Sequence, residues 1–422
     1  MSAPGERLAV IGQGYVGLPI AVRAVRTGFS VVGVDLDECR IDALVSGRSY
    51  VPDVTDTQLA AALATGRYLP TAGYADVAGF DAAIITVPTP LTECRPDLSF
   101  IEAAGRELAR HLGPGATVVL ESTTYPGTTE ELLVPLLEAG SGLTAGRDFA
   151  VGYSPERLDP GNPRWHLVNT PKLVSGIDER SLAAVRALYD RLVDTTVVVA
   201  APKEAELAKL LENTFRHVNI ALVNEIAMFA RDLGVDVWAA IDAASTKPFG
   251  YQRFTPGPGV GGHCLPIDPT YLSWQVRRRL HRSFRFVELA NDVNDHMPDY
   301  VVRRLAAALN RRHKAVADSR LLALGLAYKP NTGDVRESPA LRVVELLTEL
   351  GAAVEVVDAH VEPHRCPAGV KTVELTEDSV RLADAVVLLT DHDGVDYELV
   401  ERTADLVLDT RHRLSAEHVE YL

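Results

Sequence analysis

A glycine-rich turn near the N-terminus has the spacing of a phosphate-binding loop. Gly12, Gly14 and Gly17 form a GxGxxG pattern directly after an apolar strand and at the start of an expected helix. In that context the backbone can approach a pyrophosphate, whose charge is stabilised by the helix N-terminus. Asp35 closes the next strand, where a carboxylate would bind the ribose diol and repel a 2′-phosphate, so NAD is predicted rather than NADP. Arg40, shortly after it, weakens this preference. The expected cofactor contacts are Gly12, Gly14, Tyr15, Val16, Gly17, Asp35 and Arg40.

A single thiol lies in a second glycine-rich segment, residues 256–269, with the sequence PGPGVGGHCLPIDP. The glycines permit unusual backbone angles and close approach of a substrate to Cys264. An isolated cysteine is more often a small buried apolar residue, but a Gly- and Pro-rich loop over 247–269 is a poor place for core packing, so we expect a nucleophile. A thiolate can attack an aldehyde to give a thiohemiacetal, which becomes a thioester on loss of hydride and an acid on hydrolysis. Beside NAD, Cys264 therefore predicts oxidation past the aldehyde.

Two polar residues share one side of a long helix expected over 202–233. Lys209 and Asn213 are about one turn apart, so the ammonium could hold an alkoxide or a water while the amide donates to an oxyanion. Both residue types are also common on exposed helix surfaces, and on these residues alone a structural role is equally favoured. The same balance holds for Pro88 and Thr89, whose VPTP turn leaves a strand at the sheet edge where ligands bind.

Short apolar runs separated by helix-length segments predict that parallel sheets position these residues. A stretch without Gly or Pro after Pro202 predicts one helix of about thirty residues, long enough to connect two domains. The spacing from Gly28 to Asp35 recurs from Gly351 to Asp358, which supports two similar βαβ units. We expect strands over 8–12, 30–35, 81–87, 117–121, 149–153, 320–325, 354–358, 385–390 and 406–409, and helices over 18–27, 202–233 and most of 269–312.

The composition is that of a globular protein and narrows the choice of partners. Of 422 residues, 47% are hydrophobic and 23% charged, which excludes wholesale disorder. The formal net charge of −15 argues against nucleic acid or an anionic membrane as the main partner. No apolar run approaches the ~20 residues of a membrane helix, and four dispersed cysteines suggest neither a zinc site nor a disulfide scaffold. We therefore expect a cytoplasmic protein with no metal, nucleic-acid or membrane partner.

Together these features resemble the UDP-glucose/GDP-mannose dehydrogenase family, the nucleotide-sugar 6-dehydrogenases. The resemblance covers nearly the whole chain. It rests on seven ordered motifs: GxGYVGLP (12–19), VPTP (87–90), ESTTYPGTTE (121–130), YSPERLDPGN (153–162), KEAELAKLLENTFR (203–216), PGPGVGGHCLPIDP (256–269) and GLAYKPNTGDVRESPAL (325–341).

The resemblance implies an α/β fold with two Rossmann-like parallel-sheet domains, joined by a long central helix and a small helical domain. An NAD-binding domain would occupy 1–200, a central dimerisation domain with the cysteine loop 201–315, and a nucleotide-sugar-binding domain 316–422. The implied activity is four-electron oxidation of the C6 hydroxyl of a nucleotide-diphosphate hexose to the uronic acid, coupled to reduction of two NAD. The implied assembly is a homodimer whose neighbouring subunit helps to complete each substrate site.

The resemblance also assigns roles to single positions. Cys264 matches the family nucleophile, and Lys209, Asn213 and Asp268 match the partners that manage an active-site water and the oxyanion. Thr123 and Glu156 match residues that bind water and help to hydrolyse the thioester. The expected substrate contacts are Glu156, Arg157, Lys209, Asn213, Arg253, Gly261, Lys329 and Arg411, and the further cofactor contacts are Pro88, Thr89, Thr123 and Arg336.

The sugar and two other functions stay open at this point. Glucose-type members usually carry a Lys where this chain has Ile267 and a second Glu where it has Pro160, so a UDP-N-acetylhexosamine stands beside UDP- or dTDP-glucose as the substrate. A two-electron hydroxyacid or 6-phosphogluconate-type dehydrogenase is one alternative, but it would need neither the thiol nor a second sheet domain. An inactive nucleotide-sugar-binding protein is the other, and the complete set of candidate polar groups disfavours it.

Overall fold

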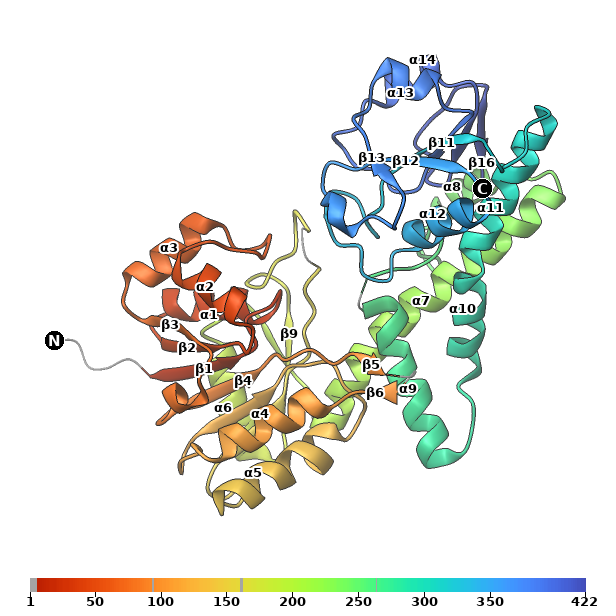
Figure 1. The fold of residues 1–422 in the computed structure, drawn as a ribbon. Coiled ribbons are helices and arrows are strands. Elements are labelled where there is room, and N and C mark those ends of the chain that lie inside the picture. The colour runs from red at the N-terminus through yellow and green to blue at the C-terminus, as the bar shows by residue number, and fades with distance from the viewer. Residues whose placement is uncertain (1–5, 93–94, 160–161, 263) are drawn as a thin grey trace. The chain divides into compact units, whose positions relative to one another are not determined.

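The protein forms two compact units, Met1–Glu212 and Asn213–Leu422, in a computed structural model that describes residues 6–92, 95–159, 162–262 and 264–422 (Figure 1). Each unit is built around a parallel sheet with helices between the strands, which confirms the predicted fold class. The predicted division into three domains at 200/201 and 315/316 stays a prediction. Pro160, Gly161 and His263, which belong to the sequence motifs, lie outside the described residues.

The first unit contains one large sheet, and neighbouring strands in it are parallel except for one antiparallel pair, Gly152–Tyr153 against Ser175–Gly176. In order across the sheet, the strands are β10 (Thr196–Val198), β9 (Lys172–Gly176), β8 (Ala150–Tyr153), β7 (Thr117–Leu120), β4 (Ala82–Ile85), β1 (Arg7–Ile11), β2 (Ser30–Val34) and β3 (Tyr68–Thr71), and a separate hairpin joins β5 (Leu91–Thr92) to β6 (Arg95–Pro96).

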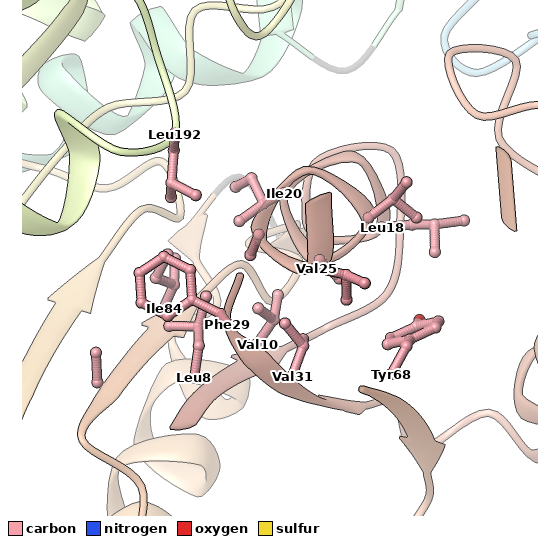
Figure 2. Close-up of a cluster of buried hydrophobic side chains, with 14 of the residues drawn as sticks. Leu8, Val10, Leu18, Ile20, Val25, Phe29, Val31, Tyr68, Ile84 and Leu192 are labelled. Atoms are coloured by element: carbon pink, nitrogen blue, oxygen red, sulfur yellow. The ribbon is translucent and has the colours of Figure 1, made fainter. Parts of the chain in front are cut away.

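Both faces of this sheet are buried, which explains why its strands are continuous apolar runs. Leu8 and Val10 of β1 point to one face, where Leu18 and Val25 of α1 cover them (Figure 2). Ala9 and Ile11 point to the opposite face, because side chains alternate along a strand. The helices of this unit are α1 (Gly17–Arg26), α2 (Glu38–Val45), α3 (Asp56–Ala64), α4 (Ser99–Ala109), α5 (Val134–Ser141) and α6 (Glu179–Tyr189), with a 3₁₀ turn over Tyr74–Val77 and a π-helical turn over Thr129–Leu133.

Helix α7 (Pro202–Asp232) is a single helix of 31 residues, as predicted, and the division between the units falls within it. Pro202 suits the first helical position, because its missing N–H would have no partner there. Gly234, just beyond the end of the helix, has a φ of +69° in the left-handed region, which lets the Val235 N–H donate to the carbonyl of Ala230 at 2.7 Å.

The second unit combines the rest of α7 with more helices and a six-stranded parallel sheet. Its helices are α8 (Val237–Ser245), α9 (Cys264–Leu280), α10 (Arg285–Asp295), α11 (Met297–Arg311), α12 (Pro339–Glu349), α13 (Glu377–Arg381) and α14 (Tyr397–Thr403), with a 3₁₀ turn over Pro363–Arg365, and its strands in order are β13 (Lys371–Thr372), β12 (Ala353–Val357), β11 (Arg320–Leu324), β14 (Ala385–Leu388), β15 (Val407–Asp409) and β16 (Val419–Tyr421).

The predicted loop over 247–269 is wrong in its last six residues, because α9 begins at Cys264. Pro266 and Pro269 belong to the Gly- and Pro-rich segment whose composition predicts a loop. A proline within the first turn of a helix removes no intrahelical hydrogen bond, since the N–H groups there have no carbonyl to reach. Only Pro269 lies far enough inside α9 to interrupt the regular bonding. Among the described residues, no helix is both long and apolar enough to cross a lipid bilayer.

The buried faces of the first sheet predict a large difference between two identical substitutions. Leu8 of β1 is fully buried, whereas Leu69 of β3 is 48% exposed. Leu8→Ala should cost about 2–5 kcal/mol of stability and lower the unfolding temperature clearly, while Leu69→Ala should change the stability by less than about 1 kcal/mol. Thermal unfolding followed by circular dichroism measures both, and equal shifts would contradict the described core.

Candidate active site

The three glycines of the N-terminal fingerprint have three different surroundings. Gly12 has a φ of +92°, and a Cβ there would lie 2.7 Å from the carbonyl oxygen of Thr86. A Cβ at Gly17 would overlap the carbonyl oxygen of Gly12. Gly14, in contrast, has no atom within 4 Å of its Cβ position. The first and third glycines are thus needed by the fold, and the second leaves open space at the backbone.

This arrangement fits the pyrophosphate of NAD. Open space at Gly14 lies just before the N-terminus of α1, where N–H groups without intrahelical partners favour an anion. Tyr15 and Val16 are the residues between Gly14 and the first residue of α1. The predicted contacts from Gly12 to Gly17 therefore form one continuous turn at the carboxyl end of β1.

Asp35 and Arg40 lie together at the end of β2. The Asp35 carboxylate accepts hydrogen bonds from the backbone N–H groups of Gln13 at 2.9 Å and Asp37 at 3.0 Å. Arg40 lies between two carboxylates, with 3.3 Å from Nη1 to Asp35 and 3.5 Å from Nε to Asp37. Its charge is therefore balanced, and a 2′-phosphate would approach two acids. This geometry favours NAD despite the nearby arginine.

Two residues that the sequence analysis missed hold the glycine turn in place. The Gln13 side chain is fully buried, donates to the carbonyl of Val10 at 2.9 Å and accepts from the Tyr68 hydroxyl at 2.7 Å. The Thr86 hydroxyl lies 2.9 Å from the carbonyl oxygens of both Ile11 and Gly12. The sequence signal available for Gln13 was a polar residue between two glycines of the motif, whereas nothing local marked Thr86.

The turn that carries Pro88 and Thr89 is linked to the segment that carries Thr123. The Ser122 hydroxyl donates to the carbonyl of Val87 at 2.7 Å, so the ends of β4 and β7 are tied together. Thr89 is buried, Pro88 is exposed and Thr123 is partly buried. These three candidates thus share the carboxyl edge of the sheet, next to β1, where ligands bind in open parallel sheets.

Glu156 lies beside a group of buried charges. Lys172 Nζ contacts Glu121 and lies 3.4 Å from Glu156 Oε2, while the Leu158 N–H donates to Glu156 Oε1. Burial alone would raise the pKa of Glu156, but Lys172, a hydrogen bond with Glu121 and the charge of Lys209 outweigh it and lower the pKa. The structure therefore brings the candidates Glu156 and Lys209 together and keeps Glu156 ionised.

Two more acids of α7 tie the surrounding loops to the helix. Buried Glu206 accepts from the backbone N–H groups of Gly127 at 2.5 Å and Thr129 at 2.9 Å, and from the Thr129 hydroxyl at 2.7 Å. Glu212 pairs with Arg157 through Nη2 at 2.7 Å and Nε at 3.3 Å. The third nitrogen of Arg157 donates to the carbonyl of Pro171 at 2.7 Å, so this predicted substrate contact anchors its own loop.

The second unit brings Asn213 and Asp268 together near the start of α9. Both side chains are buried, and Asn213 Nδ2 donates to Asp268 Oδ2 at 2.5 Å. Arg216 donates to the other end of the same amide at 2.6 Å, which fixes its orientation. Cys264 is the first residue of α9, one turn before Asp268. Three of the predicted catalytic groups therefore belong to one corner of this unit.

The glycine segment before Cys264 packs against the loop after β11. A Cβ at Gly261 would lie 2.6 Å from the carbonyl oxygen of Glu337, and one at Gly262 would lie 2.8 Å from the ring of Tyr328. The Gly262 N–H donates to the carbonyl of Arg336 at 2.9 Å. Gly261 is thus required for packing, and the segment is held by the loop that also carries Lys329.

The remaining predicted contacts are distributed over the second unit. Lys329 Nζ lies 5.9 Å from the centre of the Tyr328 ring. Arg336 pairs with Asp334 at 2.6 Å, and Arg411 Nε donates to the carbonyl of Leu389 at 2.7 Å. A Cβ at Gly257 would lie 2.8 Å from Arg411 Nη1, which places Arg411 beside the glycine segment. Arg253, by contrast, pairs with Asp242 of α8 at the surface.

A buried row of amides supports the glycine segment from α7. Asn224 accepts from the Gly257 N–H at 2.9 Å and donates to Asn294 of α10 at 3.0 Å. His217 lies on the same helix as Asn224, and its Nε2 is 2.7 Å from Asn291 Oδ1. Burial lowers the pKa of the His217 imidazole. These residues were not predicted, because their partners are far away in the sequence. Among the described residues, no three His, Cys, Asp or Glu side chains are grouped as metal ligands would be.

The glycine surroundings predict opposite outcomes for two alanine substitutions. Gly14→Ala should leave the unfolding temperature unchanged but weaken NAD binding at least about tenfold, because the methyl group occupies the place of the pyrophosphate. Gly17→Ala should lower the unfolding temperature, since its Cβ overlaps the backbone of Gly12. Calorimetric titration with NAD and thermal unfolding measure the two effects. Wild-type affinity in Gly14→Ala would exclude this turn as the pyrophosphate site.

Comparison with known proteins assigns each part of the chain to the same family. The NAD binding domain of the UDP-glucose/GDP-mannose dehydrogenase family matches residues 6–193, its central domain 203–296 and its UDP binding domain 322–416. The chain is 36% identical to the UDP-N-acetyl-D-mannosamine dehydrogenase of Pyrococcus horikoshii, over 99% of this chain and 98% of the relative. It is also 36% identical to the NDP-N-acetyl-D-galactosaminuronic acid dehydrogenase of Ralstonia solanacearum, over 98% and 97% of the two chains.

Solved structures agree with this assignment. The structure of the Pyrococcus horikoshii UDP-D-ManNAc dehydrogenase matches with a TM-score of 0.89 at 36% identity, covering 98% of both chains. A UDP-glucose dehydrogenase from Pyrobaculum islandicum matches with a TM-score of 0.88 at 29% identity, covering 100% of this chain and 98% of that one. With all three family domains present in order, the chain belongs to the UDP-glucose/GDP-mannose dehydrogenase family and is an NAD-dependent nucleotide-sugar dehydrogenase.

Proposed function

We propose that this enzyme oxidises the C6 hydroxyl of a UDP-N-acetylhexosamine to the uronic acid, in a four-electron reaction that passes through a thioester on Cys264. The observation that carries the mechanism is the corner at the start of α9, where Cys264 precedes buried Asp268 and Asp268 holds Asn213. A two-electron dehydrogenase would need neither the thiol nor a second sheet domain. The relatives named for UDP-N-acetyl-D-mannosamine and NDP-N-acetyl-D-galactosaminuronic acid support the choice of sugar.

Cys264 is the proposed nucleophile toward the aldehyde formed in the first oxidation. The thiolate is the nucleophilic form of a cysteine, and Cys264 is the first residue of α9. Its sulfur forms a C–S bond to the aldehyde carbon, and the thiohemiacetal becomes a thioester in the second oxidation. NAD, when bound, accepts one hydride in each oxidation. Water then hydrolyses the thioester, so one alcohol, two NAD and one water give one carboxylate, two NADH and three protons.

The polar groups around this chemistry have distinct proposed tasks. Asn213 donates to the oxyanion, and its amide is held in one orientation by Asp268 and Arg216. Lys209 and Asp268 manage the water and the proton of the C6 hydroxyl. Glu156, which is ionised, takes a proton from the hydrolytic water, and Thr123 helps to hold that water.

Other residues are proposed to bind the two ligands. The cofactor would be held by the turn from Gly12 to Gly17, by Asp35 beside Arg40, and by Pro88, Thr89, Thr123 and Arg336. Lys329, Arg411 and Gly261 belong to the part of the second unit around the glycine segment and are proposed substrate contacts. Arg157 and Arg253 are paired with acids of their own unit, so their proposed contribution is to shape loops near the substrate.

We also propose that the enzyme is a homodimer that uses α7. Large apolar side chains recur at helical spacing along this helix and are exposed, a pattern that marks an interface rather than a solvated face. Free thiols at Cys39 and Cys366 are in keeping with a reducing cytoplasm, where we place the enzyme. The exposed apolar residues of the helix are Leu207, Leu211, Phe215, Leu222, Ile226 and Phe229, and exposed Leu233 follows its last residue.

The stoichiometry of NADH tests the proposed reaction. UDP-N-acetyl-D-mannosamine, UDP-N-acetyl-D-glucosamine, UDP-glucose and dTDP-glucose are each added in limiting amount to enzyme with excess NAD, and absorbance at the NADH band is followed to completion. We expect two NADH per sugar for one of the acetylated sugars, with a uronic acid as product. One NADH and a free aldehyde would favour a two-electron dehydrogenase, and binding without NADH would favour an inactive binding protein.

Cys264→Ser tests the nucleophile in the same assay. The alcohol is a much weaker nucleophile than the thiolate, so steady-state turnover should fall at least about a thousandfold while the affinity for NAD stays unchanged. Normal turnover by this variant would refute the thioester. Cys39→Ser, which changes an exposed cysteine of the first unit, is the matched control and should retain full activity.

Leu211→Glu tests the proposed dimer. Leu211 is 63% exposed on α7, so a carboxylate there should leave the fold intact but prevent burial of the apolar stripe. Light scattering after size exclusion should give the mass of two 45.6 kDa chains for the wild type and of one chain for the variant. Leu350→Glu, at an exposed position 50% accessible, is the control and should stay dimeric. An unchanged mass for Leu211→Glu would place the interface elsewhere.

A further inference from the structure

A buried charge cluster lies next to Glu156 and has no task in the mechanism above. It consists of Glu121 directly after β7, Lys172 at the start of β9 and Tyr189 at the end of α6. The Lys172 ammonium contacts one oxygen of Glu121, and the Tyr189 hydroxyl donates to the other. All three residues are buried in the first unit. Only Glu156, the fourth member of the chain of contacts, reaches the partly exposed edge.

This cluster is costly if its only role is to stabilise the fold. Removing a lysine and a carboxylate from water carries a desolvation penalty of several kcal/mol per ion, and apolar residues of similar volume often serve the fold equally well. The cluster also contains two carboxylates for one ammonium. Burial raises the pKa of Glu121 to about 8, although Lys172 acts in the opposite direction. Burial thus makes Glu121 the weaker acid of the two carboxylates, whereas the pKa of Glu156 is lowered with the help of Lys172.

We propose that Lys172 is a positioning residue that keeps Glu156 ionised and correctly oriented for the hydrolysis of the thioester. This inference rests on the proposed function. In the hydrolytic step the oxygen of water forms a C–O bond to the thioester carbon and a proton of that water passes to Glu156. The C–S bond then breaks, and Cys264 leaves as a thiolate. No electrons are transferred, so the step needs only water and the carboxylate.

The charges that face Glu156 come from four elements. Lys172 of β9 lies 3.4 Å from its carboxylate, and Lys209 of α7 adds a second positive charge. Glu121 after β7 and Tyr189 of α6 complete the surroundings. Because only the two lysines are cationic, removal of Lys172 leaves Lys209 as the one remaining cation among these described neighbours. Glu156 should then be protonated up to a higher pH.

Lys172→Met tests the inference by the pH dependence of turnover. With UDP-N-acetyl-D-mannosamine, or whichever sugar of the panel yields two NADH, the acidic limb of the kcat profile should move up by at least about one pH unit. At pH values below the wild-type midpoint of this limb, kcat should fall about tenfold or more while KM for the sugar changes less than about threefold. The rapid formation of the first NADH should be unaffected, because it precedes hydrolysis.

Three further variants separate a positioning role from a general loss of stability. Lys172→Arg keeps the charge and should restore the wild-type pH profile. Glu121→Gln is nearly isosteric with the neutral acid and should keep turnover at pH 7 within about threefold of the wild type. Lys203→Met removes a lysine of the same unit that is 46% exposed and pairs with Glu130 and Glu131, and it should change nothing. A Lys172→Met profile equal to that of the wild type would overturn the inference.

A second measurement does not depend on turnover. In protein labelled with [5-¹³C]glutamate, the carboxyl signal of Glu156 is assigned with Glu156→Gln and titrated without substrate. Its midpoint should rise by at least about one pH unit in Lys172→Met, or in Glu121→Gln/Lys172→Met if the single variant does not fold. An unchanged midpoint would refute the inference even if two NADH are formed. A shifted midpoint without NADH from any sugar would instead refute the proposed function.

Discussion

Helix α7 buries several polar side chains and exposes several large apolar ones, and the placement of several candidate residues depends on this reversal. Glu206 accepts hydrogen bonds from the 127–129 turn, Glu212 pairs with Arg157, and Asn213 donates to Asp268. Further along, Asn224 accepts from the glycine segment at Gly257. Backbone groups of irregular loops must find partners once they are buried. In each unit, α7 supplies those partners, so one regular helix fixes several loops that have no regular structure of their own.

The same reversal explains why the other side of α7 cannot stay in water without cost. Residues such as Leu211 and Phe229 are exposed at positions where an ordinary surface helix carries polar groups. The polar side of the helix is occupied by loops, so an apolar partner is the natural complement of the exposed side.

In both units, an aspartate at the end of one strand accepts a hydrogen bond from the turn after the neighbouring strand. In the first unit, Asp35 at the end of β2 accepts the Gln13 N–H of the turn after β1, and in the second, Asp358 accepts the Leu326 N–H after β11 at 2.7 Å. Asp358 also lies 3.1 Å from Nε2 of buried His392, and hydrogen bonds from that side chain and the backbone lower its pKa to about 2 against the effect of burial. Its oxygens are committed to the protein, so this carboxylate is unsuited to a ribose diol. The GxGxxG pattern follows β1 in the first unit, and the segment after β11 in the second unit has no such pattern.

The sequence alone determined the features that depend on residues close together in the chain. The apolar runs of both sheets, the length of α7, the NAD fingerprint with Asp35 and the family motifs all followed from local pattern, because periodicity, glycine spacing and charge are written along the chain. The start of α9 at Cys264 did not, since prolines that normally end a helix are harmless in its first turn. Tertiary structure alone decided that Glu121, Lys172 and Tyr189 meet beneath Glu156, and that Thr86 and Asn224 hold the two glycine turns. Each of these contacts joins residues far apart in sequence, and whether a charged or polar side chain is solvated or buried against a partner is set only when distant strands and helices pack.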